Sequence, residues 1–426
     1  MKVHLTALGC RLNEAELETW SREFTGHGHQ LTNDKQNADL VVINTCAVTD
    51  EAVRKSRKLL RRIHRDNPTA KLVVSGCYAT LNPTEPDTLP GVDLIVPNTD
   101  KAKLVDIVSE RLDLPSMPAI ATEPGENLLL ARGRQRAFVK VQDGCRYRCT
   151  YCIVTKARGE ESSRSLAEIV DEINDLHQQG IQEVVLAGVH LGGYGEGQDL
   201  NISDLVTTVL RDTDVPRIRL GSIEPWDLPE GFWELFQSPR FMPHLHLPLQ
   251  SGSDSVLRRM ARRCKTDEFS QLLSDARKSV PDFNVTTDII VGFPGETEQE
   301  WRATLDYVEQ TGFGHIHIFP FSPRSGTKAA TLPDQISDEI KRERCSQLDA
   351  LASELKRQNM ESYIGTTMSV LVEGDKPQQN GFWNGYTPNF LRVAIESDVE
   401  DSLSNQIIDV EIKAIKDENA LLAVQV

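Results

Sequence analysis

Short β-branched segments alternate with amphipathic helical patterns along most of the chain, and this alternation is the feature that most restricts its fold. In the first hundred residues we expect strands over 3–8, 38–44, 71–75 and 92–96, and helices over 14–24 and 51–65. Strands that alternate with helices in this way form parallel sheets built from βαβ units. The pattern predicts an α/β fold that begins with a doubly wound parallel-sheet domain.

Three cysteines follow strands of this predicted sheet. Cys10, Cys46 and Cys77 come one to three residues after the first, second and third strands. The carboxyl ends of parallel strands share one edge of an open sheet, and ligands bind at that edge. We therefore expect these three thiols to be neighbours in space.

A second series of strands follows, and it predicts a different sheet. Its strand-like segments are 137–142, 183–188, 217–222, 244–249, 284–291 and 315–320. Six βα repeats predict a central open (β/α)6 barrel with its active end at the carboxyl ends of the strands. A long helix over 337–362 closes it, and residues 365–426 carry only β signals, which predicts a small C-terminal all-β domain. The expected boundaries are 1–113, a linker over 114–130, 131–363 and 364–426.

A CxxxCxxC loop directly follows the first strand of the predicted barrel. Cys145, Cys149 and Cys152 supply three thiolates, which leaves one iron of a four-iron cluster open to a small molecule. The amino and carboxylate groups of S-adenosylmethionine (SAM) can chelate that iron for reductive cleavage to a 5′-deoxyadenosyl radical. The alternative is zinc or structural thiols, but structural zinc needs four ligands and catalytic zinc usually has a histidine or carboxylate. The loop therefore favours iron–sulfur chemistry with SAM.

Composition restricts the class of protein. The chain has 426 residues and eight cysteines, with no signal peptide and no apolar run of about 18 residues. These features predict a cytoplasmic protein without a membrane partner, whose cysteines serve metal or redox chemistry. The net charge of −16 argues against a nucleic-acid partner, but residues 54–65 contain seven Lys or Arg and no acid. Such a run is either a solvated helix face or a patch for an anionic substrate.

The motifs together resemble those of the radical-SAM methylthiotransferases, over essentially the whole chain. The N-terminal motifs are Leu8-Gly-Cys10-Arg-Leu-Asn13, Ile43-Asn-Thr-Cys46 and Ser75-Gly-Cys77-Tyr. The later motifs are the loop from Asp143 to Arg164, Leu249-Gln-Ser-Gly-Ser253 and Gly292-Phe-Pro-Gly-Glu296-Thr297. The last β segment is similar to the RNA-binding (TRAM-like) β domain that ends members of this family.

The resemblance implies two 4Fe-4S clusters and SAM as cofactors. Cys145, Cys149 and Cys152 would hold the SAM-cleaving cluster, and Cys10, Cys46 and Cys77 an auxiliary cluster for sulfur delivery. The implied partners are the anticodon stem-loop of tRNA and an electron donor such as a flavodoxin or ferredoxin, with no DNA. Residues 365–426 carry four Lys or Arg against ten Asp or Glu, so if tRNA binds, the 54–65 run and the arginines near Cys145 must contribute much of the charge.

The motifs look most like the branch of the family that methylthiolates C2 of N6-threonylcarbamoyladenosine beside the anticodon. Two alternatives within the same chemistry are isopentenyladenosine in tRNA and an aspartate of a ribosomal protein. A third, of another class, is a non-catalytic iron–sulfur protein that binds RNA.

Further candidates for cofactor binding are Gly188, which follows the second barrel strand, and five residues of the later motifs, Gln250, Gly292, Gly295, Arg158 and Glu161. The glycines fit simple tight turns equally well, and Arg158, Glu161 and Arg164 also fit a structural ion-pair network. His244 and His246 alternate along one strand, which favours a packed, hydrogen-bonded role. Cys264 and Cys345 have no metal-like spacing and are expected to be structural.

Overall fold

A computed structural model of the chain describes residues 1–84, 91–114, 135–374, 381–396 and 402–426. Two compact units make up the chain: the first holds residues 1–131, 143–162 and 322–330, and the second holds 132–142, 163–321 and 331–426. Apart from Leu114, the linker expected over 114–130 lies outside the described residues, and the expected domain boundaries stay a prediction. Within the described part, no helix is both long and apolar enough to cross a bilayer.

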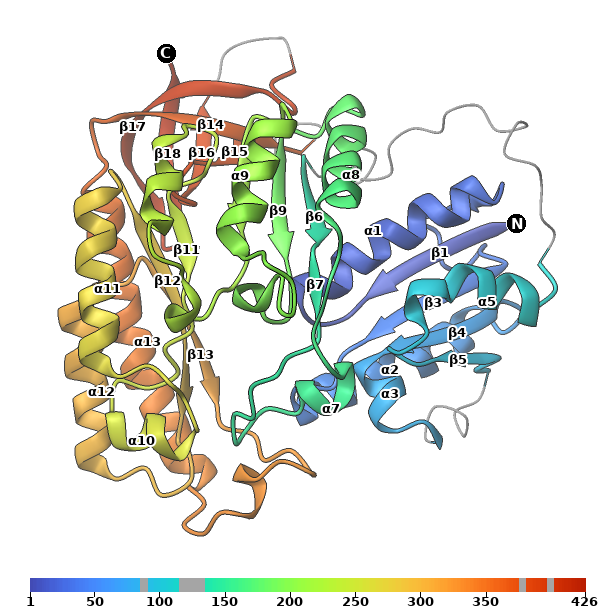
Figure 1. The fold of residues 1–426 in the computed structure, drawn as a ribbon, viewed down its shortest axis with the longest axis horizontal. Helices are drawn as coiled ribbons and strands as arrows, with labels where there is room; N and C mark the ends of the chain where they lie inside the picture. Colours follow the sequence, from blue (N-terminus) through green and yellow to red (C-terminus); the bar gives the residue numbers. More distant parts are fainter. Residues whose placement is uncertain (85–90, 115–134, 375–380, 397–401) are drawn as a thin grey trace. The chain divides into compact units, whose positions relative to one another are not determined.

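The first unit contains a five-stranded, all-parallel sheet in the order β2-β1-β3-β4-β5 (Figure 1). Its strands are β1 (Lys2–Ala7), β2 (Gln30–Leu31), β3 (Leu40–Thr45), β4 (Lys71–Gly76) and β5 (Leu94–Val96). Its helices are α1 (Arg11–Gly26), α2 (Asp50–Asp66), α3 (Cys77–Leu81), α5 (Leu104–Arg111) and α7 (Val154–Arg158), with the short η1 (Lys101–Lys103). Leu40 and Val42 of β3 pack with α1 and α5, whereas Val41 and Ile43 pack with α2 and α3. The doubly wound sheet predicted from the sequence is confirmed.

Helix α2 shows why the basic run folds as predicted. The Thr49 hydroxyl caps the helix by accepting a hydrogen bond from the Ala52 amide at 3.1 Å. Val53, Leu60 and Ile63 are buried at helical spacing, so one face of α2 is fixed on the sheet. The basic side chains are therefore left on the opposite, solvent-facing side.

The second unit contains six parallel strands that form two three-stranded sheets, β10-β9-β6 and β11-β12-β13. They are β6 (Arg136–Lys140), β9 (Glu183–Ala187), β10 (Arg217–Leu220), β11 (His244–His246), β12 (Asn284–Val291) and β13 (His315–Pro320). Parallel bridges from Ile218 to Phe241 and from Ser222 to His246 join the two sheets into one curved layer. This is the open (β/α)6 arrangement expected from the sequence.

Helices connect these strands and cover the outer side of the layer (Figure 1). They are α8 (Leu166–Gln178), α9 (Ile202–Asp212), α10 (Asp254–Arg259), α11 (Thr266–Ser279), α12 (Glu298–Thr311) and α13 (Asp338–Glu361), with 3-10 turns η3 (Leu191–Gly193), η4 (Pro225–Asp227) and η5 (Phe232–Gln237). The long closing helix expected over 337–362 is α13. Two short strands, β7 (Gln142–Asp143) and β8 (Ser162–Ser163), pair with each other.

The C-terminal strands of the second unit form a small closed barrel in the order β14-β15-β16-β18-β17. They are β14 (Thr367–Glu373), β15 (Trp383–Tyr386), β16 (Arg392–Glu396), β17 (Ile407–Asp417) and β18 (Ala420–Gln425). Trp383 is buried in the barrel core with Val370, Val393 and Leu421. The small all-β domain predicted from the β signals of residues 365–426 is confirmed, and Trp383 serves packing.

The barrel contacts the amino ends of the parallel strands in its own unit. The Arg217 guanidinium at the start of β10 donates to the Tyr386 carbonyl at 2.9 Å, and the Asn284 amide at the start of β12 donates to the Asn389 carbonyl at 2.8 Å. The guanidinium of Arg136, at the start of β6, lies 4.4 Å from the centre of the Tyr386 ring. Because the amino ends are covered, the carboxyl ends of these strands are the end at which a ligand can bind.

Candidate functional site

Cys10, Cys46 and Cys77 lie at the carboxyl ends of three neighbouring strands, β1, β3 and β4. Cys46 is 3% exposed and Cys77 is 5% exposed, whereas Cys10 is at the surface. Burial raises the pKa of the Cys46 thiol to about 11, with the nearby Cys10 and Cys77 adding to the effect. The mutual effect on the Cys46 pKa shows that the three thiols are neighbours, as predicted.

Glycines beside these cysteines permit their close approach. Gly9 has a φ of +104°, and a Cβ at this position would lie 2.6 Å from both Cβ and Sγ of Cys46. Gly76 has a φ of +94°, and its Cβ would lie 2.3 Å from the Thr45 carbonyl oxygen. Both positions therefore require glycine, which explains the Gly-Cys pairs of the motifs.

Replacing Gly9 with alanine is expected to displace Cys46 and to prevent cluster assembly at the first cysteine set. Iron per chain after anaerobic reconstitution should fall from about eight to about four, while far-UV circular dichroism stays unchanged. The matched control is Gly26→Ala, because a Cβ at Gly26 would meet nothing within 4 Å and this residue has no positive φ. Equal iron content in the two variants would contradict this prediction.

Two asparagines lie against the cysteine sulfurs. The Asn13 amide donates to the Leu8 carbonyl at 2.7 Å and to the Thr45 carbonyl at 3.3 Å, and its oxygen lies 3.7 Å from Cys10 Sγ. The Asn98 amide donates to the Ala157 carbonyl at 2.7 Å and lies 3.7 Å from Cys77 Sγ. These contacts hold the strand ends together and attach α7 to the sheet edge that carries Cys10, Cys46 and Cys77.

Arg158, at the end of α7, is the centre of a buried charge network at this edge. It donates to Asn13 Oδ1 at 2.8 Å and to Glu16 Oε1 and Asp143 Oδ1, both at 3.0 Å. Lys101 Nζ lies 2.5 Å from Glu16 Oε1 and 3.3 Å from Asp143 Oδ2. Burial opposes the charged form of Arg158, but the carboxylates of Glu16 and Asp143 outweigh it and raise its pKa.

The network balances two cations against two carboxylates, so it adds no net charge in itself. Arg158, Lys101 and Glu16 have side chains no more than 3% exposed. Sequence reasoning singled out Arg158 but missed Glu16 and Lys101, because no local pattern relates residues so far apart along the chain. The network joins the segment that carries the CxxxCxxC loop to the edge that carries Cys10.

The CxxxCxxC loop has its own backbone support. The Cys152 amide donates to the Cys149 carbonyl at 3.0 Å, and the Cys145 amide donates to the Gly159 carbonyl at 3.3 Å. Gly144 has a φ of +75°, and a Cβ there would lie 1.9 Å from the Glu160 carbonyl oxygen. All three thiols are partly exposed, as a site that admits a small molecule requires.

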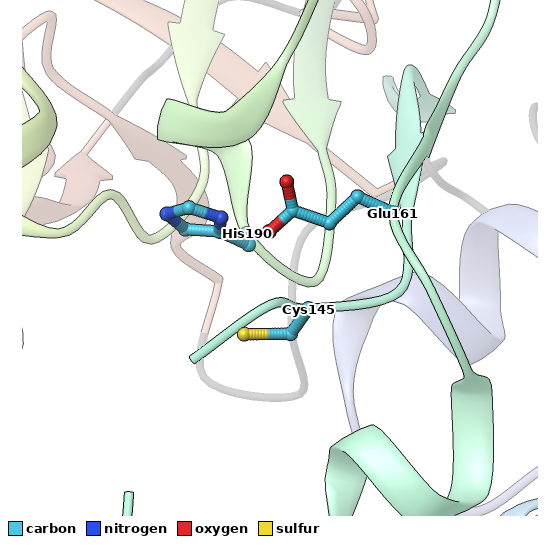
Figure 2. Close-up of side chains that lie close together, drawn as sticks. All are labelled: Cys145, Glu161 and His190. Carbon is cyan, nitrogen blue, oxygen red and sulfur yellow. The ribbon is translucent and has the colours of Figure 1, made fainter. Parts of the chain in front are cut away.

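Glu161 lies beside Cys145 and is held by Arg146. The Arg146 amide donates to Glu161 Oε1 at 2.8 Å, and its guanidinium lies 3.2 Å from Oε2. A carboxylate oxygen of Glu161 lies within 4.8 Å of Cys145 Sγ, and Figure 2 shows the two side chains extending in the same direction. Arg164, in the second unit, pairs with Glu172 at 2.5 Å, and the ion-pair or SAM-contact role expected for Arg158, Glu161 and Arg164 as a group stays a prediction.

In the second unit, the predicted SAM contacts gather at the carboxyl ends of the parallel strands. Gly188 follows β9, and a Cβ there would lie 3.0 Å from Gln142 Oε1, which also accepts the His190 amide at 2.8 Å. Gln250 follows β11 with a φ of +77°, and its amide donates to the Asp288 carbonyl at 2.8 Å. The binding of SAM by Gly188 and Gln250 stays a prediction.

His190 is a buried residue to which the sequence pattern assigns no role. Its Nε2 lies 2.6 Å from Asp227 Oδ2, and both side chains are buried within the second unit. Gly188 and the η3 turn, which lie on either side of it in the sequence, are ordinary features of a βα connection. Only the fold brings Asp227 to this ring.

Gly292 and Gly295 form a tight turn after β12, with φ values of +75° and +72°. The Gly292 amide donates to Glu296 Oε2 at 2.9 Å, and Arg344 donates to the same oxygen at 2.8 Å. Burial raises the pKa of the Glu296 carboxyl to about 7, against the opposing effect of Arg344. The turn therefore rests on a carboxyl group that titrates near neutral pH, and its role in SAM binding stays a prediction.

Raising the pH should destabilise the protein through Glu296. Its pKa is higher in the folded chain than unfolded, so its stabilising contribution is complete below about pH 4.5 and is lost as the pH rises through about 7. Relative to Glu296→Gln, the wild-type free energy of unfolding should fall by about 2–3 kcal/mol between pH 5 and 8. Urea denaturation at a series of pH values measures this. Glu298→Gln, which removes an exposed carboxylate from the same Arg344, is the control, and the stability difference between wild type and this variant should show no such trend with pH.

The remaining candidates lie in packed surroundings of the second unit. His244 Nε2 and His246 Nδ1 both hydrogen-bond to Thr286 Oγ1, at 3.1 and 2.9 Å. Burial raises the pKa of the Cys264 thiol to about 12, and Cys345 lies on α13. The structural roles expected for these four residues stay predictions.

Comparison with known proteins identifies the family. Residues 2–97 match the Uncharacterized protein family UPF0004, and residues 139–308 match the Radical SAM superfamily. The chain is 35% identical over 422 residues to the threonylcarbamoyladenosine tRNA methylthiotransferase MtaB of Bacillus subtilis, covering 95% of this chain and 92% of that protein. The chain belongs to the radical-SAM tRNA methylthiotransferase family. It is therefore a transferase that uses SAM and iron–sulfur chemistry, as the motifs indicated.

Other relatives place the chain within this family and its fold. It is 34% identical over 401 residues to the tRNA-2-methylthio-N(6)-dimethylallyladenosine synthase of Bacillus pumilus, covering 91% of this chain and 79% of that protein. The radical S-adenosylmethionine methyltransferase TsrM of Kitasatospora setae has a similar fold, with a TM-score of 0.57 and 17% identity over 77% of this chain and 75% of that one. The family membership thus rests on sequence, and the structural likeness supports the fold.

Proposed function

We propose that the chain methylthiolates C2 of N6-threonylcarbamoyladenosine in the anticodon stem-loop of tRNA, using two 4Fe-4S clusters. The observation that carries the proposal is a pair of three-cysteine sets in one unit, one at a sheet edge and one in the CxxxCxxC loop. Inserting sulfur at a C–H position needs a radical source and a sulfur donor. One open site alone provides only the first.

The residues present fit the groups that this family carries. Each set offers three thiols, which is one ligand fewer than a four-iron cluster needs, so each leaves one iron open. At the first set, Gly9 makes room beside Cys46, and Asn13 and Asn98 place amide groups near the sulfurs. When bound, the two clusters would supply the electron for SAM cleavage and the sulfur for transfer.

The chain's own residues prepare both sites. The Arg158 network holds α7 to the Cys10 edge, so that the CxxxCxxC segment is fixed to the sheet that carries the other thiols. Arg146 holds the Glu161 carboxylate beside Cys145. Gly188, Gln250, Gly292 and Gly295 bring backbone close to the strand ends where we place SAM. An acidic electron carrier such as a flavodoxin or ferredoxin would supply the electron.

The preference for N6-threonylcarbamoyladenosine rests on the relatives. Four proteins named for threonylcarbamoyladenosine are 34–36% identical, and the chain covers 86–96% of each. Proteins named for dimethylallyladenosine are 33–34% identical, with 79% covered. The alternative substrate is therefore dimethylallyladenosine.

Mass spectrometry of tRNA nucleosides tests the assignment. The reconstituted protein is given SAM, a reductant and tRNA that carries either threonylcarbamoyladenosine or dimethylallyladenosine. A methylthio mass increment on the first nucleoside alone is the expected result. An increment on the second alone would transfer the assignment to the other branch, and SAM cleavage without any increment would refute methylthiolation of tRNA.

A further inference from the structure

Helix α2 presents a surface of basic side chains in a chain whose net charge is −16. Arg54, Arg57, Lys58, Arg61, Arg62 and Arg65 line a single hollow on this surface. We call this hollow the α2 basic surface. Among the described residues its lining contains no acidic side chain, which sets it apart from the mixed charges of ordinary exposed helices.

Three cations of the α2 basic surface lie outside the ion pairs formed among the described residues. In the part of the chain that the structure describes, Arg54, Lys58 and Arg61 form no ion pair, whereas Arg62 and Arg65 lie 3.5 and 3.2 Å from Asp66. The three are spaced i, i+4 and i+7, so they form one stripe along the helix. Like charges at this spacing repel each other, so the stripe costs stability unless an anion binds it.

Packing fixes the orientation of α2, so that Arg54, Lys58 and Arg61 stay exposed to solvent. Its opposite face is buried through Val53, Leu60 and Ile63, and the Ser56 hydroxyl donates to the Cys46 carbonyl at 3.1 Å. The cations are thus presented by an element anchored to the loop of an auxiliary-site cysteine. A partner on this surface would lie in the same unit as both cysteine sets.

The chemistry of the stripe fits a phosphate backbone. Five of the six lining residues are arginines, whose planar guanidinium groups bind phosphate oxygens in pairs. At a rise of 1.5 Å per residue, Arg54 and Arg61 are about 10 Å apart along the helix axis. Successive phosphates of one strand are spaced about 3.4 Å along a nucleic-acid duplex, so the stripe spans about three of them.

We propose that the α2 basic surface binds the phosphate backbone of the RNA substrate, chiefly through Arg54, Lys58 and Arg61. This inference rests on the proposed function, because it takes tRNA as the substrate. Phosphate contacts of this kind set position and affinity and do not read sequence. Binding should therefore be sensitive to salt and insensitive to the bases that lie against α2.

The test compares two triple variants with equal charge change. Arg54→Gln/Lys58→Gln/Arg61→Gln removes the stripe, and Arg302→Gln/Arg342→Gln/Arg357→Gln removes three exposed arginines that are ion-paired on α12 and α13. Affinity of the reconstituted protein for an unmodified tRNA is measured by fluorescence anisotropy at several potassium chloride concentrations. Circular dichroism checks that each variant is folded.

The stripe variant should bind tRNA about 10–100-fold more weakly than wild type at low salt. The slope of log K against log salt should fall in magnitude by about 2–3, which corresponds to about 0.7–0.9 for each lost phosphate contact. The control variant should keep the wild-type slope. The KM for tRNA should rise in the stripe variant, with kcat nearly unchanged.

Two results would overturn the inference, and they are distinguishable. If wild type and both variants bind tRNA equally, the α2 basic surface is not the RNA site, and the proposed function stands. If the stripe variant keeps tRNA affinity but is reduced more slowly by flavodoxin, the surface serves an acidic protein instead. Wild type that binds no tRNA at any salt would overturn the proposed function together with this inference.

Discussion

Replacing Cys10, Cys46 and Cys77 together with alanine is expected to abolish methylthiolation while SAM cleavage continues. These thiols are separate in sequence from the CxxxCxxC loop, and they lie at the ends of β1, β3 and β4. Iron should fall from about eight to about four atoms per chain, since one four-iron site remains. Chromatography of 5′-deoxyadenosine and mass spectrometry of tRNA nucleosides measure the two activities in the same reaction.

Two control variants make this result specific. Cys145→Ala/Cys149→Ala/Cys152→Ala should also retain about four irons but produce no 5′-deoxyadenosine. Cys264→Ala/Cys345→Ala should retain both activities, because these cysteines lie on or beside helices of the second unit. If the first variant still methylthiolated tRNA, the sulfur would have another source, and the two-cluster proposal would be wrong.

The arrangement of these cysteines was predictable because a parallel sheet imposes it. Once 3–8, 38–44 and 71–75 are recognised as strands with helical crossovers, their carboxyl ends must share an edge. Cys46 and Cys77 directly follow the last residues of β3 and β4. The prediction needed only strand positions, which β-branched runs reveal well.

The end of a strand is harder to predict where its backbone amides donate to a side chain of the neighbouring strand instead of to that strand's backbone. The sequence predicts a strand over 244–249, but β11 ends at His246. Pro248 has no amide hydrogen to donate, and beyond it the Leu249 amide donates to the Thr287 hydroxyl at 3.0 Å. Gln250 then adopts a φ of +77°. These contacts depend on the neighbouring β12, so the strand segment itself does not reveal them.

The charge network could not be predicted from the sequence. Glu16 lies on α1, Lys101 on η1 and Asp143 on β7, and each is an ordinary charged residue in its local pattern. Only the crossover connections bring them to Arg158. The burial of these residues is a second reason why the network could not be predicted. Charged side chains usually lie in solvent, but those of Arg158, Lys101 and Glu16 are only 2–3% exposed.

Replacing Arg158 with methionine is expected to lower both the stability of the protein and its iron content. The change would leave the carboxylates of Glu16 and Asp143 with Lys101 as their remaining cation in this network. Removing one member of a buried ion-pair network typically costs about 3–5 kcal/mol, because the uncompensated charge stays buried. Urea denaturation should show this loss of stability. Iron at the Cys10 set should also fall, because Arg158 fixes Asn13 near Cys10 Sγ.

The matched control for Arg158→Met is Arg148→Met. Arg148 lies in the CxxxCxxC loop that precedes α7 and carries the same charge as Arg158, but it is 65% exposed and lies 3.9 Å from Glu160. Its removal should change the free energy of unfolding by less than about 1 kcal/mol. Iron is counted in a Cys145→Ala/Cys149→Ala/Cys152→Ala background, so that only the site of Cys10, Cys46 and Cys77 contributes.

Arg158→Lys retains the charge but lacks the planar guanidinium that reaches Asn13, Glu16 and Asp143 at once, so it should restore stability only in part. If Arg158→Met matched Arg148→Met in both stability and iron content, the network would be dispensable, and the link between the two cysteine sets would have to lie elsewhere in the first unit.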